Sequence, residues 1–465
     1  MAELWQQSAG ELARLIRDGA VSSREVVDAH LERIEAVNDR VNAVVEVRPE
    51  EVRADADRAD AARGEGRELG ALHGVPITVK INIDVTGYAT SEGCASLADF
   101  MATADAPTVE RMRGAGAIVL ARTNMPDFGL RVNTESSLFG ATHNPWRRGL
   151  TAGGSSGGEA AALATGMSPL GLGNDLGGSL RNPAFACGIA SIKPSRGRVP
   201  EGNPSALVES GLHSQLMAVE GVLARHVADV RLGLRTVMGS HRSDPQAVDA
   251  PLEARPLARR VALVPAPAGG ETHPDIQEGV RAAGRALESA GYFVEEVEPP
   301  QLVEAYFAWI ELVWTNLRMV RPLLDPFMGE DGQRYLELSD VGLGEPSEAT
   351  LFQMHMTRYR LARAWRRFME DYPLIVGPTW TQPPFAHGFD ILDAASALKV
   401  AEAFRFVLPA NVFGLPAACV PTGVAHGLPT GAQVIGLPFR EDLCLEAAEA
   451  VERALGTITP IDPRV

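Results

Sequence analysis

Apolar residues recur at helical spacing in the first part of the chain. Between residues 8 and 63 they return every three or four positions, as Leu12, Leu15 and Ile16 do, which predicts amphipathic helices. Ser22 and Ser23 precede Glu25 and can cap the second of these helices. Residues 1–65 are therefore expected to form a helical lead-in that packs on the main body.

From about residue 70 the pattern changes to short apolar runs that alternate with helical stretches. Strands are predicted at 75–80, 117–120, 169–173 and 189–192. Helices are predicted between them at 108–114, 158–165 and 179–187. Such alternation is typical of an α/β protein, in which a central sheet is covered by helices on both faces.

After about residue 200 the pattern is less regular. A helix is predicted at 227–238, and strand, helix and strand follow at 260–264, 275–290 and 293–297. Long helices rich in aromatic residues are predicted at 300–324 and 346–371, and a short strand at 374–376. Apolar runs at 417–420 and 432–435, followed by a helix at 440–454, can rejoin the first sheet.

The chain contains no internal repeat and no long linker rich in Pro, Gly or Ser. We therefore expect one domain over residues 1–465. Its parts are the helical lead-in at 1–65, a core at 70–200, variable substrate-pocket helices at 300–400 and a return to the core sheet at 405–455.

Composition and charge exclude several classes of protein. Apolar residues make up 45% and charged residues 22% of the chain, which is ordinary for a globular protein. The formal charge is −16. An acidic surface repels phosphate backbones and anionic lipid surfaces, so neither a nucleic acid nor a membrane is expected as a partner.

The cysteines and the N-terminal sequence point to a reducing compartment. Cys94, Cys187, Cys419 and Cys444 are scattered and form no C-x-x-C pair, so we expect buried free thiols rather than disulfides or a zinc site. The chain has no signal-like start and no run of about 18 apolar residues. A cytoplasmic location is the expectation.

A glycine-rich segment, Gly153-Gly154-Ser155-Ser156-Gly157-Gly158, stands directly before a predicted helix. The free N–H groups at a helix start suit an anion or oxyanion. A nucleotide-binding loop would need a lysine after the glycines, and none follows. A G-x-S-x-G nucleophile elbow matches in letters, but it needs a preceding strand and a histidine partner, and the sequence indicates neither.

A second segment, Asp175-Leu176-Gly177-Gly178-Ser179, follows a predicted strand. The N–H groups of residues 176–179 can converge on one point, so a serine in this turn is well placed to attack a carbonyl. The nucleophile would need a base, and Lys80 ends another predicted strand. Burial would lower the pKa of Lys80 below its usual value of about 10.4. The alternative is a lysine that reaches solvent from the end of its strand.

Together these segments resemble the amidase signature family. The resemblance is carried by Leu72–Lys80, Ala121–Met125, Asn144–Trp146, the two glycine–serine segments, Lys193-Pro194, Asn411–Pro416 and Gly436–Arg440. It implies the fold of that family, a large, mixed, mostly parallel twisted sheet with helices on both faces. It also implies catalysis without a metal or another cofactor.

The resemblance implies a role for each matching residue. Ser179 would be the nucleophile, Ser155 a bridging serine with a cis peptide bond, and Lys80 the base. The amides of Leu176, Gly177, Gly178 and Ser179 would form an oxyanion hole. Ser156, Asp175 and Arg181 would orient these groups. Two positions depart from the family pattern, namely Ile81, where many members have Asp, and Asn174, where a threonine is frequent.

The expected substrate is a small amide with a hydrophobic or aryl group, and water is the second reactant. Esters and carbamates (urethanes) suit the same apparatus, because their carbonyls also pass through a tetrahedral oxyanion. Seven residues of the 300–400 region and its helices could line an apolar pocket: Tyr306, Trp309, Trp314, Phe352, Met356, Trp380 and Phe385.

Two alternatives stay open at this point. One is a glutaminase that resembles the corresponding component of an amidotransferase and works with partner subunits on a tRNA-linked amino acid. The other is an inactive scaffold of the same fold. The sequence also leaves open whether the protein is a homodimer.

Overall fold

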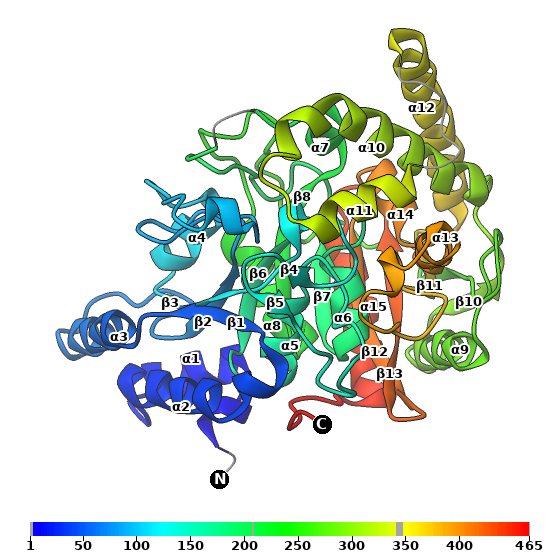
Figure 1. Cartoon of the computed structure of the whole chain (residues 1–465). Helices are drawn as coiled ribbons and strands as arrows, with labels where there is room; N and C mark the ends of the chain where they lie inside the picture. The colour runs from blue at the N-terminus through cyan, green and yellow to red at the C-terminus, as the bar shows by residue number, and fades with distance from the viewer. Residues whose placement is uncertain (1–2, 207–208, 341–346, 465) are drawn as a thin grey trace.

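The computed structural model describes residues 3–206, 209–340 and 347–464. A central sheet of eleven strands crosses the molecule (Figure 1). In spatial order the strands are β1 (Val44–Val47), β3 (Ile118–Thr123), β2 (Pro76–Lys80), β6 (Leu170–Asp175), β8 (Val219–Ala224), β7 (Ala190–Lys193), β12 (Ala417–Ala425), β13 (Leu428–Gly436), β11 (Leu374–Pro378), β9 (Arg260–Leu263) and β10 (Phe293–Glu296). β4 (Glu135–Ser136) and β5 (Gly140–Ala141) pair separately.

The sheet is mixed, as predicted, but the expectation that it is mostly parallel is wrong. β2 runs parallel to β3 and β6, and β9 runs parallel to β10 and β11. All other neighbouring strands that the structure describes in this sheet are antiparallel. The reversals arise because β8 lies between β6 and β7, and because β12 and β13 form a hairpin.

Helices surround the sheet. They are α1 (Ala9–Arg17), α2 (Ser23–Val41), α3 (Pro49–Gly64), α4 (Pro107–Gly114), α5 (Gly157–Ala164), α6 (Arg181–Cys187), α7 (Leu212–Met217), α8 (Val227–Val237), α9 (Pro274–Ser289), α10 (Leu302–Leu324), α11 (Glu330–Ser339), α12 (Glu348–Asp371), α13 (Ala394–Ala403), α14 (Leu408–Val412) and α15 (Glu441–Leu455). Short 3₁₀ turns lie at Leu4–Gln6, Ala95–Leu97, Asp127–Gly129 and Phe389–Ile391.

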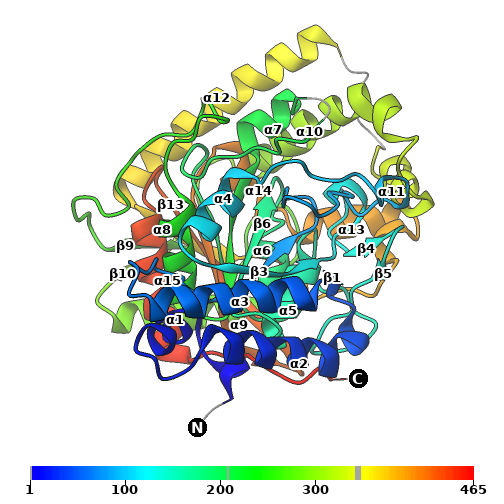
Figure 2. The same cartoon turned by 90° about the vertical axis from the view of Figure 1, so that its left-hand side faces the viewer.

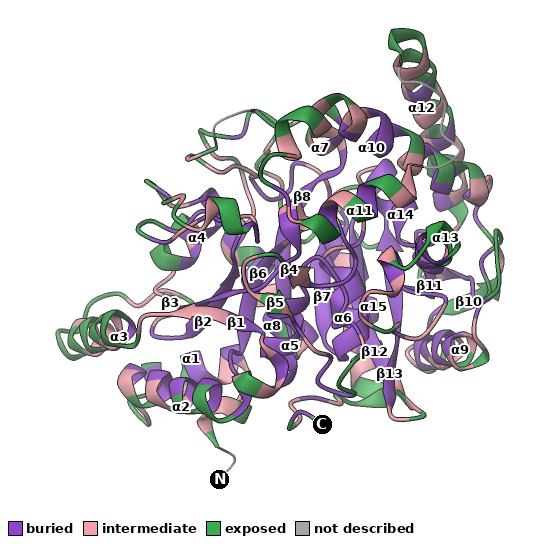
Figure 3. Ribbon diagram, in the orientation of Figure 1, coloured by how far each residue is buried: buried purple, intermediate pink, exposed green. Residues whose placement is uncertain are grey.

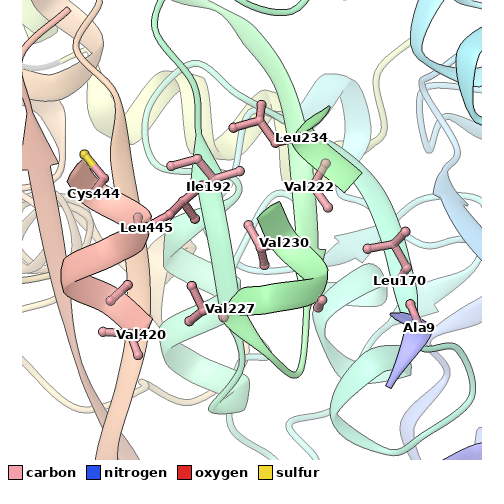
Figure 4. Close-up of a cluster of buried hydrophobic side chains, with 14 of the residues drawn as sticks. Ala9, Leu170, Ile192, Val222, Val227, Val230, Leu234, Val420, Cys444 and Leu445 are labelled. Carbon is pink, nitrogen blue, oxygen red and sulfur yellow. The ribbon is translucent and has the colours of Figure 1, made fainter. Parts of the chain in front are cut away.

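Helices cover both faces of the sheet, as predicted. Successive residues of β3 point to opposite faces: Val119 packs in the apolar cluster of α4, α8 and α15, whereas Ile118 and Leu120 pack in the cluster of α5 and α6. Figure 4 shows α8 and α15 packed on one face through Val227, Val230, Leu234, Cys444 and Leu445, against Leu170, Ile192, Val222 and Val420 of the strands. The central strands are buried along most of their length (Figure 3).

The helical lead-in differs from its prediction in one respect. The capping of α2 is confirmed, because the Ser22 hydroxyl accepts from the Glu25 amide and the Glu25 carboxylate accepts from the Ser22 amide. Residues 44–47, however, form the edge strand β1, which pairs with β3. The lead-in therefore contributes to the sheet as well as covering it (Figure 2).

The thiols lie in the interior. The four cysteines are free and buried, as predicted. Among the described helices none is long and apolar enough to cross a membrane.

Candidate active site

Lys80 and the turn after β6 meet because β2 and β6 are parallel neighbours. Thr78 pairs with Gly171 and Val79 with Leu172, so the carboxyl ends of both strands lie at the same edge of the sheet. This edge is where open α/β sheets bind ligands. Lys80 ends β2 there, and it donates from Nζ to Asn174 Oδ1 at 2.6 Å.

Lys80 is fully buried, and its Nζ also donates to Ser155 Oγ at 2.7 Å. Burial lowers the pKa of Lys80 to about 7, against the opposing charges of Glu92, Asp175 and Glu159. The structure thus brings together two of the three predicted catalytic residues. The alternative of a strand-end lysine in solvent is wrong.

Ser155 lies in the glycine-rich turn that leads into α5. The Gly154–Ser155 peptide bond is cis. The Thr134 hydroxyl donates to the Gly153 carbonyl at 2.8 Å and accepts from the Gly157 amide at 3.0 Å, which holds the turn on both sides of the serine. Ser155 is 2% exposed, so the Lys80–Ser155 contact is largely shielded from water.

Ser156 does not make the contact that an orienting residue would make. Its side chain is fully buried, and its Oγ has no hydrogen-bond partner among the described residues. Local sequence does not indicate this, because the direction of a buried hydroxyl depends on the packing around it.

The turn after β6 is held by the side chain of Asp175. Its carboxylate accepts from the Gly178 amide at 2.7 Å and from the Leu180 amide at 3.2 Å. Gly178 has φ +97°, a conformation that favours glycine. The Gly178 N–H is therefore already engaged, and the prediction that it belongs to an open oxyanion hole is not supported.

The other predicted donors of this turn remain free in the described part of the chain. The amides of Leu176, Gly177 and Ser179 have no acceptor there. Ser179 is partly exposed, and its hydroxyl makes no hydrogen bond to Lys80 or Ser155 within the same residues. The structure therefore places Ser179 at the same sheet edge without joining it to the other two.

Arg181 fixes Asp175 from the opposite side. Its Nε and Nη2 each lie 3.0 Å from a carboxylate oxygen of Asp175, and both side chains are fully buried. Asn411 donates to the same carboxylate at 2.8 Å. Burial alone would raise the pKa of Asp175, but the charge and hydrogen bonds of Arg181 outweigh it and lower that pKa to about 2. Asp175 and Arg181 together hold the turn in this conformation.

Helix α10 contacts the turn after β6 through Trp309. Trp309 Nε1 donates to the Leu176 carbonyl at 2.9 Å. A Cβ on Gly177 would lie 2.5 Å from Trp309 Cζ2, so only glycine allows this approach. Asn182 Nδ2 donates to the Gly177 carbonyl at 3.1 Å, and Asn182 Oδ1 in turn accepts from Trp380 Nε1 at 2.8 Å.

The seven aromatic and Met pocket candidates separate into three groups. Trp309 touches the turn, and Phe385 stacks on the buried Trp380 at 5.5 Å between ring centroids. Tyr306 and Trp314 are buried in the packing of α10. Phe352 and Met356 lie on α12, 64% and 57% exposed; the expectation that they line a pocket is wrong, because α12 lies at the outer edge of the molecule (Figure 1, Figure 2).

Sequence reasoning assigned no role to several residues that the structure brings to this site. Asn411 and Gln433 hydrogen-bond to Arg181 at 2.6 and 2.9 Å, and both are fully buried. Asn411 lies in a segment that carries the family resemblance, and this was the feature of the sequence that could have pointed to it. For Gln433 the sequence gives only one indication, which is that a polar residue stands within an apolar run.

The described residues offer no set of ligands for a metal ion. Over residues 3–206, 209–340 and 347–464 no group of three or more His, Cys, Asp or Glu side chains is placed to hold a metal ion.

Several known proteins are similar to this chain in sequence or in fold. The chain is 41% identical to an indoleacetamide hydrolase of Bradyrhizobium diazoefficiens, over 98% of this chain and 88% of the relative. It is 33% identical to a subunit of the glutamyl-tRNA(Gln) amidotransferase of Salinispora arenicola, over 99% of both. The solved structure of 6-aminohexanoate cyclic dimer hydrolase complexed with substrate is similar with a TM-score of 0.85, at 27% identity, over 100% of this chain and 99% of that one.

A family model described as Amidase matches residues 25–445. The segments that carry the resemblance lie within this range. The chain belongs to the amidase signature family of amide hydrolases.

Proposed function

We propose that the protein hydrolyses the amide bond of small aryl or hydrophobic amides through an acyl-enzyme on Ser179. The observation that carries the proposal is the buried 2.7 Å contact between Lys80 Nζ and Ser155 Oγ, beside a turn with free backbone amides. The chain's 41% identity to an indoleacetamide hydrolase supports an arylacetamide as the substrate.

The proposed reaction begins with neutral Lys80. Its Nζ takes the proton of the Ser155 hydroxyl, and Ser155 takes the proton of the Ser179 hydroxyl, whose oxygen attacks the carbonyl carbon. The hydrogen bond between Ser155 and Ser179 would form with substrate bound, since such contacts are often long in a free enzyme. The pKa of about 7 for Lys80, which results from burial, makes the neutral base available near neutral pH.

The oxyanion then needs donors. The amides of Leu176, Gly177 and Ser179 have no acceptor in the described protein and are free to supply them. The Gly178 amide instead secures the turn through Asp175.

Collapse of the tetrahedral intermediate breaks the C–N bond. The leaving nitrogen receives the proton that Lys80 holds, passed back through Ser155. Water then attacks the acyl-enzyme with the same groups acting as base, which releases the carboxylic acid and restores Ser179.

Purified protein tests this proposal with a matched substrate panel. We expect ammonia and acid to be released faster from indoleacetamide and phenylacetamide than from acetamide, and Ser179→Ala to abolish the release from each. Aryl esters and aryl carbamates should be cleaved by the same residues. A Ser179→Ala variant with activity near that of the wild type would contradict the mechanism, whereas a preference for acetamide would contradict only the substrate class.

A second candidate is the glutaminase component of an amidotransferase. The 33% identity to such a component over almost the whole of both chains favours it. That function requires release of ammonia from glutamine together with partner subunits. Glutaminase activity that appears only when such partners are added, without arylacetamide hydrolysis, would select it over the first proposal.

A further inference from the structure

Lys80 Nζ has two hydrogen-bond partners, and only one of them is a serine. Nζ donates to Ser155 Oγ at 2.7 Å and to Asn174 Oδ1 at 2.6 Å. Asn174 belongs to β6, one residue before Asp175, and the parallel pairing of β2 with β6 brings it beside the end of β2. Within the described residues Nζ makes no third hydrogen bond. The amide of Asn174 is therefore as close to the proposed base as the serine is.

The amide of Asn174 is held in one orientation. Its Nδ2 donates to Asn82 Oδ1 at 3.0 Å. The carbonyl of Asn82 accepts from Asn203 Nδ2 at 2.8 Å, and Asn203 Oδ1 accepts from the Asp84 amide at 3.1 Å, so the loop that carries Asn82 is itself fixed. An amide side chain offers one oxygen that accepts and one nitrogen that donates. Reversal of the Asn174 amide would turn its N–H groups toward Nζ and its oxygen toward Asn82 Oδ1, and both hydrogen bonds would be lost.

The two partners of Nζ differ in what they can do. The Ser155 hydroxyl can donate or accept, whereas the Asn174 oxygen carries no hydrogen and can only accept. A protonated lysine has three N–H groups and no lone pair, and a neutral lysine has two N–H groups and one lone pair. In both states an N–H group must point at Asn174, because a lone pair directed there would meet an oxygen. Only the contact with Ser155 can reverse, so Asn174 turns the lone pair of the neutral amine away from β6 and toward the serine hydroxyl.

The charged groups around Lys80 act on it without a hydrogen bond to Nζ. Burial lowers the pKa of Lys80 to about 7, and the charges of Glu92, Asp175 and Glu159 oppose that change. Asp175 is paired with a buried arginine, and Glu159 accepts from two threonine hydroxyls. Arg122 donates to the Lys80 carbonyl at 3.2 Å. Among the described residues the direct partners of Nζ are thus a hydroxyl and a neutral amide.

We propose that Asn174 is a positioning residue for the base: it accepts a hydrogen bond from Lys80 Nζ in both protonation states and so directs the lone pair of the neutral amine to Ser155. The inference rests on the proposed function, in which Lys80 takes the proton of Ser155. The family resemblance implies no role for Asn174, since this position departs from the family pattern. Asn82 supports the role, because it fixes the direction of the Asn174 amide.

The first test is Asn174→Leu, which keeps the approximate size of the side chain but removes the accepting oxygen. Without that acceptor the lone pair of Lys80 is free to turn away from Ser155, so we expect kcat to fall about fivefold to tenfold with little change in KM. The control is Asn316→Leu on α10, where the Asn316 amide donates within its own helix to the Leu312 carbonyl at 2.7 Å, and its kcat should match the wild type. A kcat of Asn174→Leu equal to that of the wild type would overturn the inference.

The pH profile of kcat/KM separates this role from a merely structural one. Asn174→Asp keeps an accepting oxygen and adds a negative charge beside Nζ, which favours the protonated form of Lys80, so the acidic limb should move to higher pH by about one unit. Asn174→Leu removes a hydrogen bond that is stronger to an ammonium than to an amine, so its acidic limb should move to lower pH. A variant that only loosened the fold would lose rate without moving the limb. Limbs that stay in place in both variants, or that move in the same direction, would overturn the inference.

Asn82→Ala keeps the inference testable if the Asn174 variants fold poorly. It leaves both partners of Nζ in place but releases the Asn174 amide, so kcat should fall about threefold to fivefold with little change in KM, and a wild-type kcat would overturn the inference. Fluorophosphonate labelling of Ser179 reports on Lys80 without a substrate, and its pH dependence in Asn174→Asp should shift as kcat/KM does. If Lys80→Met keeps its activity, the proposed function itself fails; if Lys80→Met is inactive while the Asn174 and Asn82 variants behave as the wild type, only the inference fails.

Discussion

At the scale of single residues, the chain has few lysines, and they differ in how far they are buried. It contains three lysines, of which Lys80 and Lys193 are fully buried and Lys399 is exposed. Burial lowers the pKa of Lys193 to about 7 as well, but its Nζ donates to the Pro194 carbonyl at 2.8 Å. Lys80 differs because its Nζ meets a serine hydroxyl. The partner, more than burial, makes Lys80 the candidate base.

Replacement of Lys80 by methionine should reduce kcat by at least about a thousandfold, because methionine cannot accept the serine proton. In the wild type kcat/KM should rise as pH increases through about 7, since burial holds the pKa of Lys80 there and only the neutral amine is a base. Lys399→Met is the control and should keep both the rate and the profile. A wild-type profile that stays flat from pH 5 to pH 9 would contradict this role for Lys80.

At the scale of elements, the conformation of the turn after β6 depends on the elements around it. The turn follows β6, α6 begins directly after it, and α10 covers it through Trp309 and Leu176. Trp309 belongs to a helix within residues 300–400, and Trp380 of the same region donates to Asn182, so this part of the chain contacts the site although much of it lies outside. Substitutions in α10 at Trp309 can therefore alter the turn directly.

Trp309→Phe removes the hydrogen bond to the Leu176 carbonyl but keeps the aromatic packing against Gly177. We expect kcat/KM to fall about fivefold, which corresponds to a hydrogen bond of about 1 kcal/mol. Trp314→Phe, in the same helix but packed against Tyr335, is the control and should change the rate by less than twofold. Equal losses in the two variants would mean that α10 acts only through general packing.

Arg181 joins the turn to the return strands and to α14. Arg181→Met would leave the Asp175 carboxylate buried without its partner, and the free energy of unfolding should fall by about 3–5 kcal/mol at pH 7. The exposed pair of Arg14 with Glu11 offers a control, and Arg14→Met should lower the free energy of unfolding far less than Arg181→Met does. Urea titrations of both variants measure the difference, and equal small losses would contradict the account.

The same pair sets a pH dependence of stability. The folded-state pKa of Asp175 is lowered to about 2 from its ordinary 3.8, because the charge of Arg181 outweighs the effect of burial. A lowered carboxyl pKa contributes stability that is complete above about pH 5 and is lost as the pH falls through the folded-state pKa of about 2. Asp175→Asn should therefore show a smaller decrease in stability between about pH 5 and pH 2 than the wild type in thermal unfolding.

At the scale of the whole molecule, the alternating pattern predicted the α/β class, the helices on both faces and most elements of the core. β8 was missed because Glu220 and Gly221 interrupt its apolar run, although it lies at the centre of the sheet. Its Glu220 carboxylate is buried and accepts from Thr108, which belongs to α4. Such a partner, distant in sequence, cannot be read from local spacing.

That Lys80 and Ser155 meet was expected from the resemblance to the amidase signature family, whereas residue type alone left the position of Lys80 open. The rest depends on directions that only the folded chain defines. The Gly178 amide donates to the Asp175 carboxylate, and the Ser156 hydroxyl has no hydrogen-bond partner among the described residues. The helical pattern predicted α12 correctly. The exposure of its apolar side chains could not be predicted, because it follows from the position of α12 at the edge of the molecule.

The central claim is that Ser179 is the nucleophile of this amidase, and covalent labelling tests it most directly. Wild-type protein treated with a fluorophosphonate should gain the mass of one adduct, and peptide mapping should locate it on Ser179. Ser179→Ala should gain none, and Lys80→Met should react much more slowly. An adduct on Ser155 or on another residue, or no adduct on an enzyme that hydrolyses amides, would contradict the account.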